Sequence, residues 1–481
     1  MANQSSFLQD NVFSSEKRDM HVIRVQNFFL LLVLFNSIAL AIQVLLPSYL
    51  NFKSSEALSA RIDDGPWCNP QIQGIGLHCF GDFYYSLQFA NEHNPWSGRN
   101  NNYPPLATAF YKPFSFIDQH FPNSHISLLI YLLFGFLCVM FPIAHATIFR
   151  KINWNLSVII CLITLSSAPI LMAFDRGNIQ IIIFPFIYLF TLAELESNYF
   201  KIMLYGMILI LFKPQMILLG AIFLAKREIR KGLLWLGASF ILSLSTFLIY
   251  PVNGIENLQK FLGMLRNYQQ YTNAGSPNPT NVSIANTWSI LERLATVAFP
   301  SFFHKDPLGR WDFYPIWISI VIIILIFLNL FFFGAKRIKS VNLFIVLSIP
   351  VLIPNVSFAY YLCIYSPLLL LILIDGLSKS YVPFQCAENN GAVSKIEGLR
   401  IFQSRTDFIL FSLFYFITFI PWAIPWKIIP YFNNLPWSSI GVNWFPGQII
   451  LLVLLGKLLL QGIDFKLFRR PKFEPKRKGV K

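Results

Sequence analysis

Charged side chains are scarce in this 481-residue chain. Only 13% of its residues are Asp, Glu, Lys or Arg, and 55% are hydrophobic. Soluble globular proteins carry about 25% charged residues, so the composition excludes an ordinary soluble fold. Apolar runs of about 20 residues, each long enough to cross roughly 30 Å of hydrocarbon, recur along the chain. We therefore predict an all-α polytopic membrane protein with a single integral membrane domain over residues 1–481.

The motifs of soluble enzymes are also missing. The chain contains no Walker loop, no dinucleotide fingerprint, no nucleophile elbow and no set of His and Cys residues at metal-binding spacing. We therefore expect neither a nucleotide cofactor nor a metal ion.

Cysteine is rare, and only two of the six cysteines fall outside the predicted spans and the cytoplasmic side. These two are Cys68 and Cys79, in "WCNPQIQGIGLHC". Disulfides persist in extracytoplasmic compartments, so we predict a Cys68–Cys79 bridge, with two free thiols as the alternative. A zinc site is not expected, because His78 would supply only a third ligand.

The apolar runs predict about twelve membrane-spanning helices. The first, "VQNFFLLLVLFNSIALAIQVLL" (Val25–Leu46), is too long for a signal-peptide core and lacks a small-residue cleavage site, so we expect a retained anchor. The other spans are expected at His125–Phe149, Leu156–Phe174, Gln180–Leu195, Ile202–Phe212, Met216–Ala225, Gly232–Tyr250, Phe313–Gly334, Val341–Phe358, Tyr360–Gly376, Asp407–Ile424 and Gly447–Phe465.

Lysine and arginine mark the cytoplasmic side of such a protein. Basic clusters occur at Lys226–Lys231, at Ala335–Lys339 and in the tail at 466–481. We therefore expect a plasma-membrane protein with both termini in the cytoplasm. The net charge of +15 then reflects topology and gives no case for nucleic-acid binding, whereas the basic tail is expected to contact anionic lipid headgroups.

On this topology two extracytoplasmic loops are long, at 47–124 and 251–312, and residues 378–405 form a cytoplasmic linker. In the first loop, "YPPLATAFYKPFSFI" (Tyr103–Ile117) has Pro at a helix start and aromatic residues on one side, which predicts a helix in the headgroup plane. Together the loops are expected to form a shelf on the outer membrane surface.

Asp82 is the acidic residue in this shelf that is the candidate for catalysis. It opens "DFYYSLQFANEH", which predicts an amphipathic helix with Asp82, Tyr85, Ser86 and Phe89 on one face. The functional interpretation is a general base whose pKa the neighbouring aromatic residues raise. The alternative is a helix N-cap, a role that Asp after Gly also suits.

A predicted turn between the third and fourth spans, "FDRGNIQ", carries Asp175 and Arg176. Ionisable residues at the rim of a helix bundle often mark sites. Gly177 and Asn178 open the next helix, whose N-terminal amides could hold an anion. A local salt bridge with a cap is the alternative.

Lys213 interrupts the apolar run "LILILFKPQMILLG", and Pro214 is expected to break the helix there. A buried cation beside a broken helix is typical of a cavity lining, where it would bind a phosphate. The alternative is a Lys that snorkels to the outer interface.

The second long loop contains "FLGMLRNYQQYTNAGSPNPTNVSIANTWSILERL" (Phe261–Leu294). It combines side chains suited to sugar hydroxyls and ring faces, namely Arg266, Tyr268, Gln269, Tyr271, Asn281, Ser283, Asn286 and Trp288. "NVS" is also a weak glycosylation pattern.

The order of these motifs resembles that of the bacterial glycosyltransferases of family 87. The shared pieces are "GDFYYSLQFA", "YPPL", "RGNIQ", "FKPQ", "NVSIAN" and "SFAYYL". The resemblance implies a GT-C-like bundle, with amphipathic helices in its two long loops, that uses polyprenyl-phosphate sugars. A Trp-His pair common in the family after the ninth span is replaced here by "SFAYY", so no His role transfers.

The resemblance also implies roles. Asp82 would be the base of an inverting transfer, and Lys213, with Arg176 or Arg266, would neutralise the leaving phosphate. The remaining candidates for substrate binding are Tyr85, Tyr103, Asp175, Asn178, Gln215, Asn281, Ser283 and Tyr360. The expected partners are a polyprenyl-phosphate-linked sugar, a hexose such as mannose, and a lipid-linked or envelope glycan acceptor.

Two other functions compete with this interpretation. A transporter or lipid-sugar flippase with twelve spans would predict matched halves, short outer loops and ionisable residues near the membrane midplane. No internal match between the halves is evident, and the ionisable residues concentrate at the outer rim. The other competing function is a non-catalytic subunit of envelope assembly.

Overall fold

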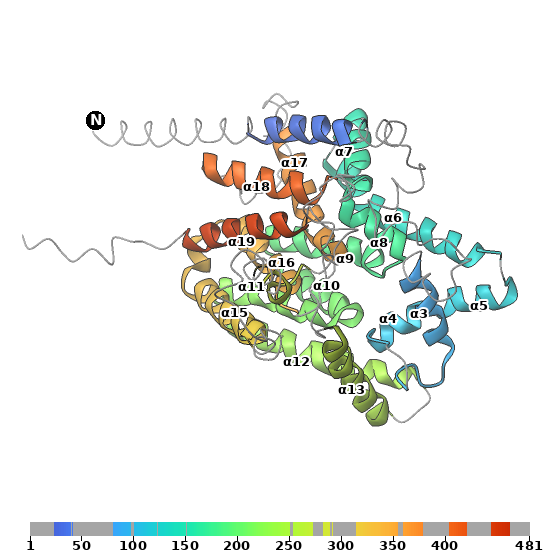
Figure 1. The fold of residues 1–481 in the computed structure, drawn as a ribbon. Coiled ribbons are helices and arrows are strands. Elements are labelled where there is room, and N and C mark those ends of the chain that lie inside the picture. Colours follow the sequence, from blue (N-terminus) through green and yellow to red (C-terminus); the bar gives the residue numbers. More distant parts are fainter. Residues whose placement is uncertain are drawn as a thin grey trace, which may run out of the picture.

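A computed structural model describes the chain as a set of packed helices (Figure 1). The described residues are 24–39, 41, 80–97, 101–122, 124–150, 152–250, 254–272, 282–288, 291, 314–354, 359–378, 404–420 and 444–461. The predicted Cys68–Cys79 bridge and the basic tail at 466–481 lie outside these residues, as does nearly all of the linker at 378–405.

The described residues contain helices and no strand. After an N-terminal helix, Arg24–Ala39, the helices are α3 (Gly81–Asn91), α4 (Pro105–Phe110), α5 (Lys112–His120), α6 (Ile126–Arg150), α7 (Trp154–Leu165), α8 (Ala168–Arg176), α9 (Gln180–Leu195), α10 (Tyr199–Phe212), η1 (Pro214–Gly220), α11 (Ala221–Ala225), α12 (Ile229–Ser245), η2 (Thr246–Ile249), α13 (Gly254–Thr272), α15 (Tyr314–Phe333), η4 (Gly334–Lys336), α16 (Lys339–Leu352), η5 (Ala359–Tyr365), α17 (Ser366–Ser378), α18 (Arg405–Thr418) and α19 (Trp444–Leu460).

Three helical stretches of the described chain are long and apolar enough to cross a membrane. They are Ile126–Phe149, Ile229–Ile249 and Ser319–Lys336, and they leave many large apolar side chains exposed on their outer faces, as lipid contact requires. Shorter apolar helices include α9, whose bounds are those of the predicted fourth span. The protein is therefore a membrane protein, and the number of twelve spans stays a prediction.

The predicted third span is bent. Its two parts, α7 and α8, meet at an angle of 61°. Pro169 lies at the start of α8 and cannot continue the hydrogen bonding of α7, and the amide of Ala168 donates instead to the carbonyl of Phe419. The bend gives α8 a direction of its own, and the C-terminal end of α8 carries Arg176.

Helix α9 lies in the main hydrophobic core. It packs against α6, α10, α16, α17 and η5, and nearly all of its side chains are buried. The Trp235 ring of α12 packs against Gly206 and Gly220. A Cβ added to Gly206 would lie 2.9 Å from a ring atom, and one added to Gly220 would lie 2.5 Å from a ring atom. This dense interior holds the N-terminal end of α9, and the residues just before it, in a defined position.

A smaller hydrophobic cluster joins the two long loops that the sequence predicts. Trp96, from the segment after α3, is 1% exposed and packs against Phe247, Tyr250 and Phe261. Its indole Nε1 donates to the carbonyl of Tyr103 over 3.1 Å. Figure 1 shows the result, with α3, α4 and α5 gathered at one edge of the molecule and α13 close below them. Whether these helices lie in the headgroup plane stays a prediction.

Candidate active site

The start of α3 is attached to the end of α8. Phe80 adopts a left-handed conformation (φ 53°), and its amide donates to the carbonyl of Asp175 over 2.6 Å. Phe80 occupies the N-cap position, and no side chain caps the helix. Asp82 lies in the first turn instead, so the N-cap interpretation of this residue is wrong, and its carboxylate turns toward α8.

A glycine allows this close approach. Gly177 ends α8 with φ 61°, and a Cβ built on it would lie 2.6 Å from the Cβ of Phe83. The hydroxyl of Tyr111 donates to the carbonyl of Gly177 over 3.3 Å, and the Phe83 ring packs on those of Tyr111 and Tyr131. These buried aromatic contacts fix α3 against the turn that carries Arg176 and Asn178.

Asp82 forms the acidic part of the site. Arg176 donates from Nη2 to Oδ1 over 3.1 Å and from Nε to Oδ2 over 3.3 Å, which is a two-point ion pair. Asn178 donates to Oδ2 over 2.5 Å. The two charged side chains are only 12% and 18% exposed. Arg176 thus pairs with an acid 94 positions away in the chain.

Asn178 connects the acid to the rest of the site. This fully buried side chain also donates to the hydroxyl of Tyr103 over 3.0 Å, and its Oδ1 receives Lys213 Nζ over 3.4 Å. The same oxygen accepts the backbone amide of Gln180 over 3.0 Å. Side chains from three other segments thus meet at this carboxamide.

Lys213 supplies a second buried cation. The helix break predicted at Pro214 is present, and Lys213 lies in extended conformation between α10 and η1. Its side chain is 4% exposed, so it does not snorkel to the interface. Nζ donates to the hydroxyl of Tyr361 over 2.9 Å and lies 4.6, 5.2 and 5.7 Å from the ring centroids of Tyr361, Tyr103 and Tyr360. No carboxylate in the described chain forms an ion pair with it.

The electrostatic balance at Asp82 differs from the expectation. Burial raises the pKa of the carboxyl, but the charge and hydrogen bonds of Arg176, the hydrogen bond of Asn178 and the charge of Lys213 outweigh it. The net pKa of Asp82 lies below its ordinary value. The predicted rise was wrong, because the aromatic neighbours are accompanied by a cation from α8 that sequence proximity does not indicate.

The predicted anion site at the N-terminal end of α9 is also not supported. The amide of Gln180 donates to Asn178 Oδ1, and that of Ile181 donates to the Asn178 carbonyl. The next two amides donate to the carbonyl of Ile179. These amides are therefore already hydrogen-bonded within the chain.

The buried cluster therefore brings together Asp82, Tyr103, Arg176, Asn178, Lys213 and Tyr360, all predicted from the sequence. Tyr360 is 4% exposed in η5, stacks on Tyr361 with centroids 5.0 Å apart, and faces Arg176 at 6.0 Å. Tyr361 was missed. The doubled aromatic in "SFAYYL" was the available signal, but the pattern does not say which of the two hydroxyls meets Lys213.

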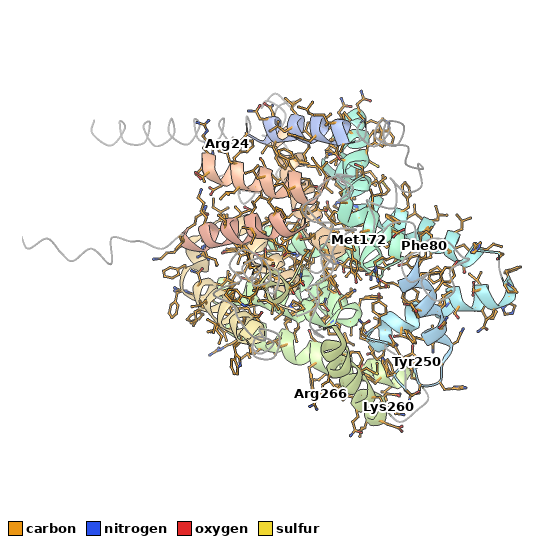
Figure 2. The ribbon with its side chains drawn as sticks, in the orientation of Figure 1. Arg24, Phe80, Met172, Tyr250, Lys260 and Arg266 are labelled. Atoms are coloured by element: carbon orange, nitrogen blue, oxygen red, sulfur yellow. The ribbon has the colours of Figure 1, made fainter. Side chains whose placement is uncertain are left out.

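Five other predicted residues are not placed in this cluster. Tyr85 is 44% exposed and stacks on Phe89. Asp175 contributes its backbone carbonyl to Phe80. Gln215 is half-buried in η1, and Ser283 Oγ accepts the amide of Asn286. Arg266 is exposed on α13. Figure 2 shows it apart from the labelled Phe80, two residues before Asp82, and Met172, four residues before Arg176.

Asn281 lies outside the described residues. Among the residues that the structure describes, no group of three or more His, Cys, Asp or Glu side chains is arranged to hold a metal ion.

Residues 101–354 match glycosyltransferase family 87. The chain belongs to this family. No curated protein and no solved structure matches it. The matched range includes Tyr103, Arg176, Asn178 and Lys213, whereas Asp82 lies before it. The assignment of Asp82 to the site therefore depends on its contacts with residues inside the range.

Proposed function

We propose that this family 87 glycosyltransferase moves a sugar, with inversion, from a polyprenyl-phosphate donor to a lipid-linked or envelope glycan acceptor on the extracytoplasmic face of the membrane. A hexose such as mannose is the expected sugar. One observation carries the proposal: the carboxylate of Asp82 shares a buried cluster with two cationic side chains, Arg176 and Lys213.

The cluster contains the groups that such a displacement needs. A base must accept the proton of the acceptor hydroxyl as the new bond forms at the anomeric carbon. Cations must stabilise the charge that develops on the departing phosphate. Asp82 is suited to the first task, because its lowered pKa keeps it ionised. Arg176 and Lys213 are suited to the second, and a metal ion is not required for it.

In the described arrangement the base is occupied, because Arg176 and Asn178 donate to its two oxygens. A donor phosphate that approaches Arg176 competes with the carboxylate for the same guanidinium, which binds both anions through a planar fork. Transfer of Arg176 to the phosphate removes the strongest cause that lowers the pKa of Asp82. Burial then dominates, and the carboxylate becomes a stronger base once the donor is in place.

Lys213, unlike Arg176, does not have to leave a carboxylate in order to bind the donor phosphate. Its charge is buried among aromatic rings and two neutral oxygen atoms. The carboxylate of Asp82 is already paired with Arg176, so the cluster holds one cation more than it has anions, and an uncompensated buried charge is costly. A donor phosphate would supply the counter-charge, which favours binding of the lipid-linked substrate over a neutral sugar.

The position of the cluster agrees with a lipid substrate. The reacting carbon of a polyprenyl-phosphate sugar stays at the headgroup level, and α5, next to the site, exposes the apolar side chain of Phe116. We propose that the chain spans the membrane many times with both termini in the cytoplasm. Membership of a glycosyltransferase family disfavours the transporter alternative.

A reconstituted assay tests the proposal. Proteoliposomes would be supplied with radiolabelled polyprenyl-phosphate hexoses and pentoses and with a lipid extract as acceptor. We expect transfer from one donor class and its loss in Asp82→Asn. Asp118→Asn, which changes a carboxylate of the neighbouring helix α5, is the matched control and should keep wild-type activity. Full activity of Asp82→Asn would exclude this residue as the base.

A further inference from the structure

Gln180 is a buried amide whose side chain neither caps a helix nor bonds to a nitrogen or oxygen atom of the described chain. It begins α9 and is 0% exposed. Its backbone amide donates to Asn178 Oδ1, so the helix start does not need its side chain. Neither Nε2 nor Oε1 has a nitrogen or oxygen partner among the described residues.

Such a side chain is unfavourable in an apolar interior. The three residues that follow it, Ile181, Ile182 and Ile183, are all buried. An amide buried without hydrogen bonds costs free energy that an apolar side chain of the same size would not cost. An unsatisfied group of this kind in a folded protein therefore requires an explanation, and a ligand group provides one.

The position of Gln180 indicates which ligand. Asn178, two positions earlier, contacts both Asp82 and Lys213. The thiol of Cys363, in η5, interacts with the Gln180 side chain and with the charge of Lys213. Gln180 thus borders the same interior region as the cation proposed to bind the donor phosphate.

We propose that Gln180 binds the sugar of the donor, through a hydroxyl close to the anomeric carbon; this proposal rests on the proposed function. A phosphate oxygen only accepts hydrogen bonds, so it would satisfy Nε2 and leave Oε1 unpaired. A sugar hydroxyl both donates and accepts, so one hydroxyl or a neighbouring pair can satisfy both amide atoms. Gln180 is therefore a specificity-determining residue for the sugar, beside a phosphate site formed by Lys213 and Arg176.

The test uses Gln180→Met, which keeps the side-chain volume and removes both polar atoms. Two quantities are measured on the full-length protein: the KM for the polyprenyl-phosphate sugar, and the Kd for polyprenyl phosphate without a sugar. We expect the KM to rise at least tenfold and the Kd to stay within twofold. The midpoint of thermal unfolding should stay the same or rise, because an unpaired amide has been removed.

Thr191→Val is the matched control. It removes a buried hydroxyl from the same helix, about 16 Å along its axis at 1.5 Å per residue, where Thr191 donates to the carbonyl of Ile187. Its KM and Kd should both equal those of the wild type. Lys213→Met should instead raise both the KM and the Kd, because Lys213 is proposed to bind the phosphate that both lipids carry.

A set of donors that each lack one hydroxyl locates the contact. The tenfold penalty of Gln180→Met should disappear for one of these donors and persist for the others. An unchanged KM in Gln180→Met, or an equal loss of affinity for the sugar-free lipid, would overturn the assignment to the sugar while leaving the proposed function intact. Absence of transfer by the wild-type protein from every polyprenyl-phosphate sugar would instead overturn the proposed function, and this inference with it.

Discussion

Arg176 Nη2 lies 3.1 Å from Oδ1 of Asp82, and this ion pair joins helix α8 to helix α3. It places the proposed base and one proposed phosphate ligand in direct contact. Because the guanidinium cannot bind the carboxylate and a phosphate in the same way at once, the two partners compete for it. The consequence can be measured as a shift in the pH dependence of transfer.

The first prediction concerns that pH dependence. In the free enzyme the pKa of Asp82 is below its ordinary value, so the acidic limb of kcat/KM should lie at low pH. In the donor complex Arg176 is withdrawn and the pKa rises, so the acidic limb of kcat should lie at higher pH. In Arg176→Gln the arginine no longer offsets the effect of burial on the pKa of Asp82. The acidic limb of kcat/KM should therefore shift to higher pH and coincide with the acidic limb of kcat. Rates measured from pH 3 to pH 8 decide this, and coincident acidic limbs of kcat/KM and kcat in the wild-type protein would contradict the exchange of Arg176.

The same ion pair contributes to stability with a defined sign. Because the pKa of Asp82 is lower in the folded than in the unfolded protein, its contribution is complete above the unfolded value of about 3.9 and is lost as pH falls through the folded value. Asp82→Asn should therefore remove part of the acid sensitivity of unfolding. Thermal unfolding in detergent from pH 7 to pH 3 measures this effect, and an unchanged slope in the variant would contradict it.

Gly177→Ala should damage the site without touching a charged group. The new Cβ would meet the Cβ of Phe83 at 2.6 Å, and a left-handed conformation costs a non-glycine residue about 1–2 kcal/mol before that clash is counted. We expect lower stability and at least a tenfold loss of kcat/KM as α3 moves away from α8. Gly81→Ala is the control, because an added Cβ there meets nothing within 4 Å. Equal behaviour of the two variants would show that the close approach is unimportant.

Tyr361→Phe tests whether the hydrogen bond from Lys213 to the Tyr361 hydroxyl matters for donor binding. The substitution keeps the aromatic ring and removes the hydroxyl that accepts from Nζ over 2.9 Å. A hydrogen bond to a charged group contributes about 1.5–3 kcal/mol to folding stability, so we expect a lower unfolding midpoint. We also expect a higher KM for the donor, because Nζ is no longer held in position. Tyr205→Phe, in α10, removes a hydroxyl for which the described chain shows no partner, and should have little effect. A wild-type KM in Tyr361→Phe would exclude this hydroxyl from donor binding.

Trp96→Ala tests the attachment of the first loop to α13. Removing a buried Trp costs about 3–5 kcal/mol, and here it also removes the bond to the Tyr103 carbonyl. We expect a lower unfolding midpoint, faster limited proteolysis near α13 and reduced transfer. Trp154→Ala, at an indole that is 72% exposed, should leave all three measurements close to those of the wild type.

Much of the site could be predicted because each residue is unusual where it stands. Lys213 is a charged residue within an apolar run, and Asp82 is an acid directly after a glycine. Both can be recognised from their immediate neighbours in the sequence. The bounds of α9 were also predictable, because a long apolar run is a local property. The family resemblance then placed these residues in a known order along the chain.

What could not be predicted depends on contacts between distant segments. Burial raises the pKa of Asp82, and the net lowering depends mainly on Arg176, an arginine 94 positions away at the end of the bent pair α7 and α8. The interaction between Lys213 and Tyr361 spans 148 positions, and either tyrosine of the pair in η5 would fit the pattern. Neighbouring residues in the sequence hold no information on such pairings.

The packing of Trp96 on α13 has a practical consequence for exchanging parts between relatives. The first loop packs through Trp96 on Phe261 of α13 and on Phe247 and Tyr250, in and just after η2. A chimera that replaces one loop alone would therefore lose either the indole or the side chains that bury it. Exchanging these loops between members of the family without loss of stability therefore requires that both be moved together.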